Sequence, residues 1–536
     1  MGKYFGALSP RSFSSPSNLG EGLDETKVYK NASILFSPFD FSLLTTLPLQ
    51  FSIKAAVMLS ILRAGGAQRG LNPLKFSRTI TTATQTQTQT STSRGRGPRK
   101  EGDISSVFAS LSGTEATPLP ARFASIKQSL LLPHAPAIVA SWSRLLSSLR
   151  SEISEIATAG SDIIPSIDFE EIHNHSRVQP FANSLRKRGA AIIRGVVPEE
   201  QALGWKSEIR DYLIANPQTK AFPKDNPAVF ELYWSPGQIK ARANANVIET
   251  QRFLMSFWHS SDPNAAVWTD KPVSYADRLR IRKPGDAGFA LGAHVDGGSV
   301  ERWEADGYGK GHVYDKVFEG RWEEFDPWES SGRLQAESDL YNGAGACSMF
   351  RMFQGWLSMS DTRPGEGTLL GGEWILDEKN WELDIEQSSV LQGASLGCTL
   401  ELNDALHPHL ELSKSMIHVP EVRPGDYVAW HCDSLHAVDK IHAGKGDSSV
   451  LYIPACPLTK TNAEYLVRQR EAFLDGTPGP DFPGGIGESE HAGRMTKKDV
   501  EIAGGKQALI AMGLGPWETG SKKGRGADEN GNIYVI

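Results

Sequence analysis

The chain has 536 residues, of which 39% are hydrophobic and 22% are charged, so it contains enough apolar material for a large folded core. Its formal net charge of −7 argues against nucleic acid as a main partner, because phosphate binding requires a basic face. The four cysteines form no C-x-x-C pair and no apolar run reaches about 18 residues, which argues against a disulfide scaffold, a structural zinc site and a transmembrane helix.

Residues 1–121 are rich in Ser, Thr, Gly and Pro, a composition typical of disordered or targeting segments. Between Leu59 and Lys100 there is no acidic residue, while Arg and Lys recur throughout. Such a stretch after Met58 is typical of a mitochondrial transit peptide, which would place the functional start at Met58. A solvated basic linker is an equal alternative. We therefore expect an intracellular protein, mitochondrial in the first case and cytoplasmic in the second.

The next segments predict helices around a first strand. Apolar residues recur at helical spacing over residues 135–159, which predicts a helix there. An extended segment over residues 164–169 precedes a buried strand over residues 189–196. Pro198, followed by two acidic residues, begins a helix that we expect to end near Ala215.

The chain then becomes rich in strands. Residues 277–282 alternate strictly, with Leu279 and Ile281 on one face and Arg278, Arg280 and Arg282 on the other, and we interpret the arginines as a mainly solvated face. Further strands are predicted over residues 348–358, 426–430 and 448–453. A capping-box pattern that begins at Thr461 predicts a last helix, ahead of residues 465–474.

Helices on both sides of short strands predict an α+β fold with a jelly-roll (cupin-like) core flanked by helices. We place this domain over residues 122–520, after a disordered N-terminal extension over residues 1–121 and before a polar tail over residues 521–536.

The most informative motif is His294-Val295-Asp296, which is followed by two glycines. Residues i and i+2 of a strand point the same way, so His294 and Asp296 can reach one ion together. His436, just beyond the predicted strand over residues 426–430, supplies a third ligand. Two imidazoles and one carboxylate are typical of the facial triad of non-haem Fe(II) oxygenases.

Other histidines offer weaker alternatives. His431 and Asp433 form a second H-x-D pair, which we interpret as accessory to the first. His407 and His409 flank Pro408, and this pattern favours a surface turn over a metal site.

Several motifs carry a resemblance to a known family. They are the segments over residues 233–236, 275–282, 294–303, 353–356 and 430–433. In this order they resemble the Fe(II)/2-oxoglutarate-dependent oxygenase superfamily and, more narrowly, its YbiU-like branch of unknown function, over about residues 130–515. The resemblance implies a double-stranded β-helix that holds one Fe(II) through His294, Asp296 and His436.

The resemblance also implies a reaction. The cosubstrate 2-oxoglutarate is converted to succinate and CO2 while a small organic, amino-acid-like substrate is hydroxylated, desaturated or cyclised. The expected partner is thus a small-molecule substrate, with no nucleic acid and no membrane. The alternatives are a jelly-roll protein that binds a metal without oxygenase turnover, and a non-catalytic ligand-binding scaffold.

One departure from the superfamily concerns the cosubstrate. Its members usually carry an Arg soon after the distal His, whereas here no Arg occurs between His436 and Arg468. A buried carboxylate still needs a cationic partner, so Arg351 and Arg282 are the candidates for binding 2-oxoglutarate. For Arg351, an ion pair with Asp361 is the alternative.

Overall fold

The computed structural model describes residues 62–64, 99, 102–111, 118–362, 376–383, 388–482 and 484–517, all within the unit Thr45–Ile536. Met58, most of the predicted leader and the predicted tail lie outside these residues. The described α-helices are α2 (Arg122–Leu131), α3 (Ala135–Ala159), α4 (His175–Arg188), α5 (Glu199–Ala215), α6 (Pro236–Ala243), α7 (Ala245–Met255), α8 (Asp315–Phe318), α9 (Leu412–Ser415), α10 (Lys460–Asp475) and α11 (Lys497–Ala511).

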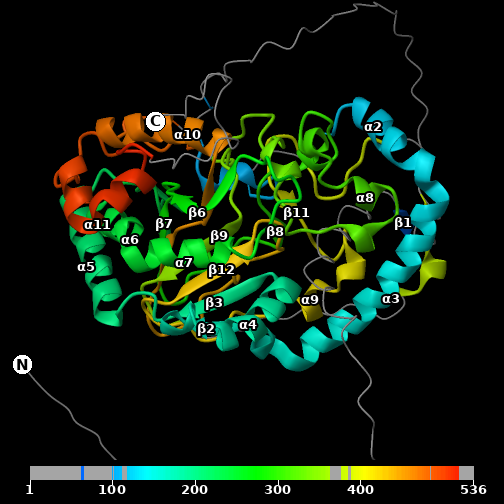
Figure 1. Ribbon diagram of the computed structural model, residues 1–536, viewed down its shortest axis with the longest axis horizontal. Coiled ribbons are helices and arrows are strands. Elements are labelled where there is room, and N and C mark those ends of the chain that lie inside the picture. The colour runs from blue at the N-terminus through cyan, green and yellow to red at the C-terminus, as the bar shows by residue number, and fades with distance from the viewer. Residues whose placement is uncertain are drawn as a thin grey trace, which may run out of the picture. The chain divides into compact units, whose positions relative to one another are not determined.

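The described strands form one large sheet and three short pairs. The strands are β1 (Leu62–Ala64), β2 (Ser166–Asp168), β3 (Ala190–Arg194), β4 (Ala221–Phe222), β5 (Val229–Phe230), β6 (Val267–Val273), β7 (Leu279–Arg282), β8 (His294–Val295), β9 (Phe353–Ser358), β10 (Trp381–Leu383), β11 (Leu400–Glu401), β12 (Tyr427–His431), β13 (Ser448–Tyr452) and β14 (Cys456–Thr459). The large sheet has eight strands in the order β2-β3-β12-β9-β13-β7-β5-β4. Only β2 and β3 run parallel among its pairs, and β11-β8, β14-β6 and β1-β10 are separate antiparallel pairs (Figure 1).

The two faces of the large sheet differ in chemistry. One face carries Phe353, Leu357, Tyr427 and Leu451, which join residues of α4, α5 and α7 in one buried apolar cluster. Because side chains alternate along a strand, the residues between them point to the opposite face. That opposite face, which we call the inner face, carries residues 280 and 282 of β7, 450 and 452 of β13, 354 and 356 of β9, and 428 and 430 of β12.

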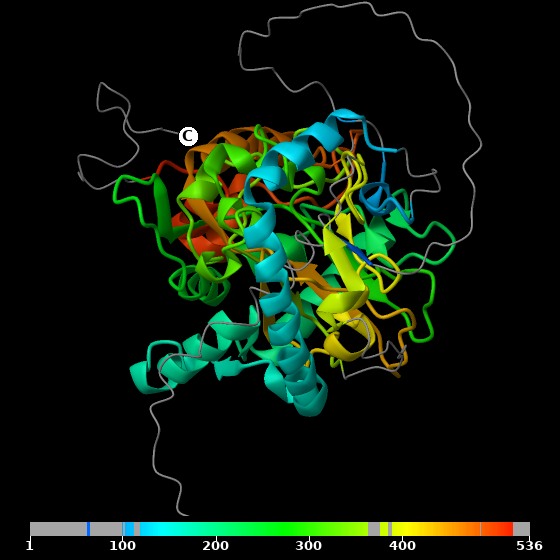
Figure 2. The same cartoon turned by 90° about the vertical axis from the view of Figure 1, so that its right-hand side faces the viewer.

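Helix α3 supports the short strands that hold the candidate site. Its buried residues Ile138, Trp142, Leu145 and Leu149 recur every three or four positions, which places them on one side of the helix. They belong to the same apolar cluster as Val295 of β8 and Leu400 of β11. Figure 2 shows α2 and α3 running along one side of this unit.

The structure confirms the coarser part of the predicted fold. Helices over residues 135–159 and 199–215 and strands near residues 190, 280, 355, 428 and 450 are present where the sequence predicts them. The result is a mixed α/β structure with a large mixed sheet and helices. The jelly roll stays a prediction, since the described strands form one eight-stranded sheet and two-stranded pairs. Within the described ranges, no helix is both long and apolar enough to cross a bilayer.

The prediction of a solvated arginine face on β7 is wrong. Arg278 and Arg282 are buried, and Arg280 is half-buried. β7 lies between β13 and β5, so both of its edges are hydrogen-bonded, and the low exposure of Arg278 and Arg282 shows that the face with the arginines is covered as well. On β7 the apolar residues face the buried cluster and the arginines face the inner side of the sheet, so the alternation does not mark a solvent-exposed face.

Two local expectations are also wrong. Thr459, rather than Thr461, caps α10 by accepting a hydrogen bond from the Asn462 backbone N–H at 3.1 Å. His407 and His409 are completely buried, so the segment around Pro408 is no surface turn.

Candidate metal centre

The three predicted ligands come together at the edge of the β8-β11 pair. His294 lies in β8, opposite Glu401 of β11, and Asp296 directly follows the strand. On its other side His294 faces His436, and the two residues exchange backbone hydrogen bonds of 2.9 and 3.0 Å. Two residues of distant sequence are thus fixed side by side by main-chain contacts.

The side chains of these residues converge on one point. The Nε2 atom of His294 lies 3.8 Å from Asp296 Oδ1, and the Nε2 atom of His436 lies 3.6 Å from Asp296 Oδ2. All three ligand atoms lie within 4.8 Å of one another. This spacing fits one metal ion between them, since metal–ligand bonds of about 2.0–2.2 Å separate neighbouring ligand atoms by about 3–4 Å.

The hydrogen bonds of the two imidazoles prepare them as ligands. His294 Nδ1 lies 2.7 Å from the Gly292 carbonyl oxygen, and His436 Nδ1 lies 3.1 Å from the Ser434 carbonyl oxygen. A carbonyl can only accept, so each Nδ1 carries the proton when the ring is neutral and each Nε2 presents a lone pair. Two lone pairs that face a carboxylate form an arrangement that suits a cation between them.

Electrostatics favour the metal-ready protonation states. Burial and, next, the neighbouring His436 lower the pKa of His294 to about 4, so this imidazole is neutral at pH 7. Burial acts to raise the pKa of Asp296, but His436, His294 and Arg351 together hold it well below its usual range. The site therefore offers a neutral nitrogen and an ionised carboxylate without deprotonation.

Gln354, which sequence reasoning did not single out, orients the carboxylate. Its Nε2 donates to Asp296 Oδ2 at 2.8 Å, and its Oε1 accepts a hydrogen bond from the Trp430 indole N–H. Both residues lie on the inner face of the large sheet. The only sequence signal was the segment over residues 353–356, in which a Gln stands between apolar residues.

The two glycines after Asp296 allow the chain to turn away from the site. Gly297 and Gly298 have φ values of 81° and 93°, which L side chains rarely adopt. A Cβ atom on Gly298 would also lie 2.8 Å from the Ser338 carbonyl oxygen. Larger residues would therefore displace the backbone that carries Asp296.

The second H-x-D cluster is already saturated. Asp433 is bound by Arg333 and, at 3.1 Å, by Arg302, and it also accepts from the Tyr314 hydroxyl at 3.1 Å. His431 Nε2 lies 3.0 Å from the Pro327 carbonyl oxygen, and its Nδ1 accepts the Asp433 backbone N–H at 3.0 Å. The Cys432 thiol also accepts a hydrogen bond from Arg333 Nη1 at 3.7 Å, so each potential ligand of this cluster already has a partner.

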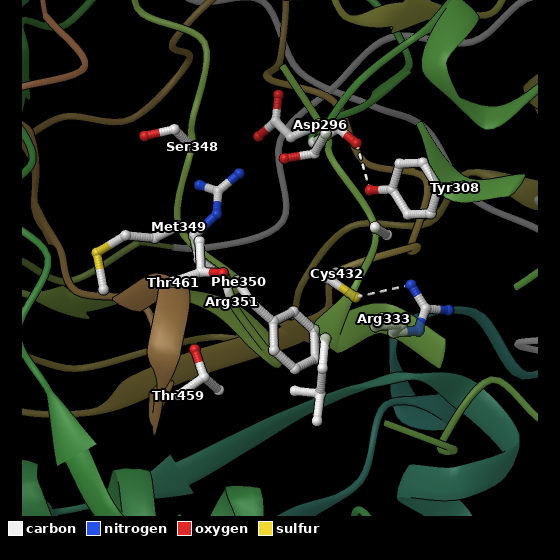
Figure 3. A pocket seen from close by; sticks show the side chains of 14 residues that line it. Asp296, Tyr308, Arg333, Ser348, Met349, Phe350, Arg351, Cys432, Thr459 and Thr461 are labelled. Atoms are coloured by element: carbon white, nitrogen blue, oxygen red, sulfur yellow. Dashed lines mark hydrogen bonds between the residues drawn. The ribbon is translucent and has the colours of Figure 1, made fainter. Parts of the chain in front are cut away.

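A pocket opens on the Asp296 side of the metal centre. Its lining includes Asp296, Arg351, Ser348, Thr459 and Thr461 (Figure 3). Figure 3 shows the guanidinium of Arg351 pointing toward the space between Asp296 and Ser348.

The two arginines predicted to bind a cosubstrate differ in their surroundings. Arg351 has no hydrogen bond and no ion pair to any described residue, so the alternative ion pair with Asp361 is not formed. Its charge lies near Asp296 and over the ring of Tyr275, at 6.0 Å from the centroid. Arg282, by contrast, donates to Asp286 Oδ2 at 2.7 Å and to the Asp286 carbonyl at 2.9 Å.

An N-terminal arm, made of Arg99 and residues 102–111, also reaches this region. The ring of Phe108 packs edge-on against His294 with centroids 4.8 Å apart. The Thr399 backbone N–H donates to the Val107 carbonyl at 2.8 Å, which extends the β11 side of the site. Contacts with the core thus begin upstream of Arg122, and sequence reasoning found none of them.

Comparison with known proteins gives a consistent family. The Gig2-like family matches residues 117–513. The uncharacterized protein YbiU of Escherichia coli K12 is 33% identical over 376 residues, which cover 67% of this chain and 88% of that protein. The crystal structure of GlcNAc Inducible Gene 2 from Candida albicans has 28% identity and a TM-score of 0.63, and the match covers 76% of this chain and 92% of that chain. A protein from Salmonella typhimurium LT2, provisionally named an oxidoreductase, has 29% identity and a TM-score of 0.64, with 74% and 99% covered.

Proposed function

Since the chain belongs to the Gig2-like family, we propose that it is a non-haem Fe(II)/2-oxoglutarate-dependent oxygenase that oxidises a small organic molecule. The observation that carries this proposal is the convergence of His294, Asp296 and His436 around one point beside a pocket. The provisional name of the Salmonella typhimurium LT2 protein supports an oxidoreductase in general terms.

The donor set fits Fe(II). Two imidazole nitrogens and one carboxylate oxygen suit this ion, and three protein ligands leave coordination positions for other molecules. When bound, Fe(II) with 2-oxoglutarate and dioxygen couples loss of CO2 from the cosubstrate, which leaves succinate, to insertion of one oxygen atom into a substrate C–H bond. Desaturation or ring closure would use the same ligands.

The protein's own residues prepare and enclose this chemistry. The carbonyls of residues 292 and 434 fix the imidazole tautomers, and Gln354 fixes the carboxylate. We assign Arg351 to the far carboxylate of 2-oxoglutarate, because it lines the pocket beside Asp296 and its guanidinium has no partner among the described residues. Arg282 serves this role less well, since Asp286 already neutralises it.

An anaerobic titration with Fe(II) and then 2-oxoglutarate tests the proposal. Chelation at an open facial site gives a weak visible charge-transfer band near roughly 500 nm. We expect this band in the wild-type protein, its loss together with iron binding in His294→Ala, and an unchanged band in Tyr314→Phe, which removes one hydrogen bond of the second cluster and does not line the pocket. Arg351→Gln should keep iron binding but require much more 2-oxoglutarate for the band.

The two alternative functions, a metal-binding protein without oxygenase turnover and a non-catalytic ligand-binding scaffold, predict different results in the same titration. Normal iron binding without the band would indicate a metal-binding protein without oxygenase turnover. Absence of iron binding would indicate a non-catalytic scaffold. Retained conversion of 2-oxoglutarate to succinate by His294→Ala would refute the ligand assignment.

A further inference from the structure

Arg351 and Arg280 are half-buried, and neither side chain has a hydrogen-bond or ion-pair partner within the described part of the chain. Among the described residues, Arg302 and Arg333 share Asp433, Arg282 is bound by Asp286, and Arg278 lies 3.4 Å from the Asp277 carboxylate. Arg351 and Arg280, in contrast, form no hydrogen bond or ion pair with any described residue. A half-buried guanidinium without a counter-ion from the protein is available to bind an external anion.

Arg280 lies on the inner face of the sheet, the face that carries the metal centre's support. It stands opposite Val450 of β13, and Val450 in turn stands opposite Ser358 of β9. Directly opposed residues of neighbouring strands project to the same side, so Arg280 shares its face with Gln354, which binds Asp296. Its Nε atom is buried and has no hydrogen-bond partner among the described residues.

Tyr452 connects this position to the metal centre. It follows Val450 by two residues on β13 and therefore points to the inner face as well. Burial raises the pKa of Tyr452, the charge of Arg280 acts against that rise, and the charge of Asp296 adds to it. In the strand register Tyr452 lies diagonally from Arg280 across the β7-β13 pair and directly opposite Trp356 of β9. A ligand held by Arg280 and Tyr452 would therefore lie on the face that carries Gln354.

The cosubstrate needs only one of the two unpaired arginines for charge balance. A divalent ion and Arg351 balance the charges of Asp296 and of the two carboxylates of 2-oxoglutarate. In this charge balance the positive charge of Arg280 is not compensated. A planar guanidinium with a nearby phenol hydroxyl suits a carboxylate, because the group can accept two parallel N–H bonds and one O–H bond.

We infer that the substrate of the proposed oxygenase is an organic acid whose carboxylate is bound by Arg280 and Tyr452. That this acid is a substrate rests on the proposed function, but binding of an anion at Arg280 and Tyr452 requires neither metal nor 2-oxoglutarate. It can therefore be tested in the metal-free protein, where failure of the oxygenase proposal has no effect.

The first experiment measures anion binding to the metal-free full chain by 19F NMR. The probe is 3,3,3-trifluoropropionate, and its uncharged amide is the control ligand. The Arg351→Gln protein, which removes the other free guanidinium, should bind the acid but not the amide. Adding Arg280→Gln should weaken this binding by about ten- to a hundredfold, the effect of losing one charge-assisted contact. Equal binding of acid and amide, or binding that Arg280→Gln leaves unchanged, would overturn the inference.

A second measurement separates a ligand-binding arginine from a structural one. Because Arg280 has no partner among the described residues of the free protein, Arg280→Gln should unfold at the same denaturant concentration as the wild type or at a higher one. The matched control Arg282→Gln, which breaks the pair with Asp286, should unfold at a lower concentration. A loss in Arg280→Gln as large as in the control would show a structural role and sink the proposal.

A third measurement uses the iron-loaded enzyme. Organic acids should stimulate succinate release where their amides do not, and Arg280→Gln should raise the KM for the stimulating acid about ten- to a hundredfold. The KM for the cosubstrate should stay unchanged. If the cosubstrate KM rose instead, Arg280 would bind the cosubstrate, and the inference about the substrate would be wrong.

Discussion

Arg99, in the N-terminal arm, neutralises two buried carboxylates at once. Its Nη2 lies 2.7 Å from Asp339 Oδ2 and 2.8 Å from Asp481 Oδ1, and its Nη1 donates to the Gly343 carbonyl. The exposed fractions of the three side chains are 7%, 1% and 0%. Asp481 also accepts the backbone N–H of Ser348 at 2.8 Å, and Ser348 lines the pocket.

Replacing Arg99 with Gln should therefore destabilise the whole described unit. Removal of one partner from a buried ion pair costs about 3–5 kcal/mol, because the remaining charge is left without compensation. Asp481 keeps its hydrogen bonds to Tyr275 and Ser348, so we expect a loss near the lower end, about 3 kcal/mol. That is a large share of a total stability of about 5–15 kcal/mol.

Urea unfolding of the full chain, followed by circular dichroism and tryptophan fluorescence, measures this loss. Arg144→Gln is the matched control, because Arg144 binds Glu323 at 2.6 Å but is 52% exposed. A surface pair of this kind contributes about 0–1 kcal/mol. If Arg99→Gln unfolds at the same urea concentration as Arg144→Gln, the arm is not anchored as the geometry requires.

Three further predictions concern the site and the core. Gln354→Leu should weaken Fe(II) binding about 10- to 100-fold in an anaerobic titration without unfolding the chain, because the carboxylate loses its orienting donor. Asp433→Asn should cost about 3–5 kcal/mol in urea unfolding, since two arginines lose their partner, yet leave one iron bound per chain; loss of iron from a stable variant would mark residues 431–433 as the metal site. Burial raises the pKa of Glu488 from 4.5 to about 7, so the folded chain binds this proton more tightly than the unfolded chain. Its contribution to stability is complete below about pH 4.5 and is lost as the pH rises through about 7; Glu488→Gln should flatten that decline, and an unchanged pH profile would contradict the reasoning.

The sequence was sufficient where local pattern and burial agree. The apolar periodicity of residues 135–159 coincides with α3, because one side of this helix packs on the core. His294 and Asp296 project to the same side because they are two residues apart on an extended segment. His436 joins them because its backbone pairs with that of His294. The polar residue Gln354 stands out within an apolar run of the sequence. Its role could not be predicted, because that role depends on a hydrogen bond to Asp296, which is distant in sequence.

The sequence failed where tertiary context reverses the meaning of a pattern. The alternation on β7 predicts a strand with one solvent-exposed face. In the structure β7 pairs with β13 and β5, and the face with the arginines is largely buried. Arg282 meets Asp286, which is only four residues further along the chain, because the turn after β7 brings this carboxylate back to the end of the strand. Arg280 meets no acidic side chain among the described residues, and this depends on neighbouring strands that are distant in sequence.

The arm bears on how the basic leader can be processed. The family match begins at residue 117, yet Phe108 contacts the candidate ligand His294 and Arg99 binds the carboxylate that holds Ser348. If the leader is a transit peptide, cleavage before Arg99 leaves these contacts intact. Cleavage after Phe108 would strip one face of His294 and leave two buried carboxylates without their guanidinium. Both contacts therefore tie the segment from Arg99 to Phe108 to the candidate site, and a cleavage upstream of Arg99 would keep them.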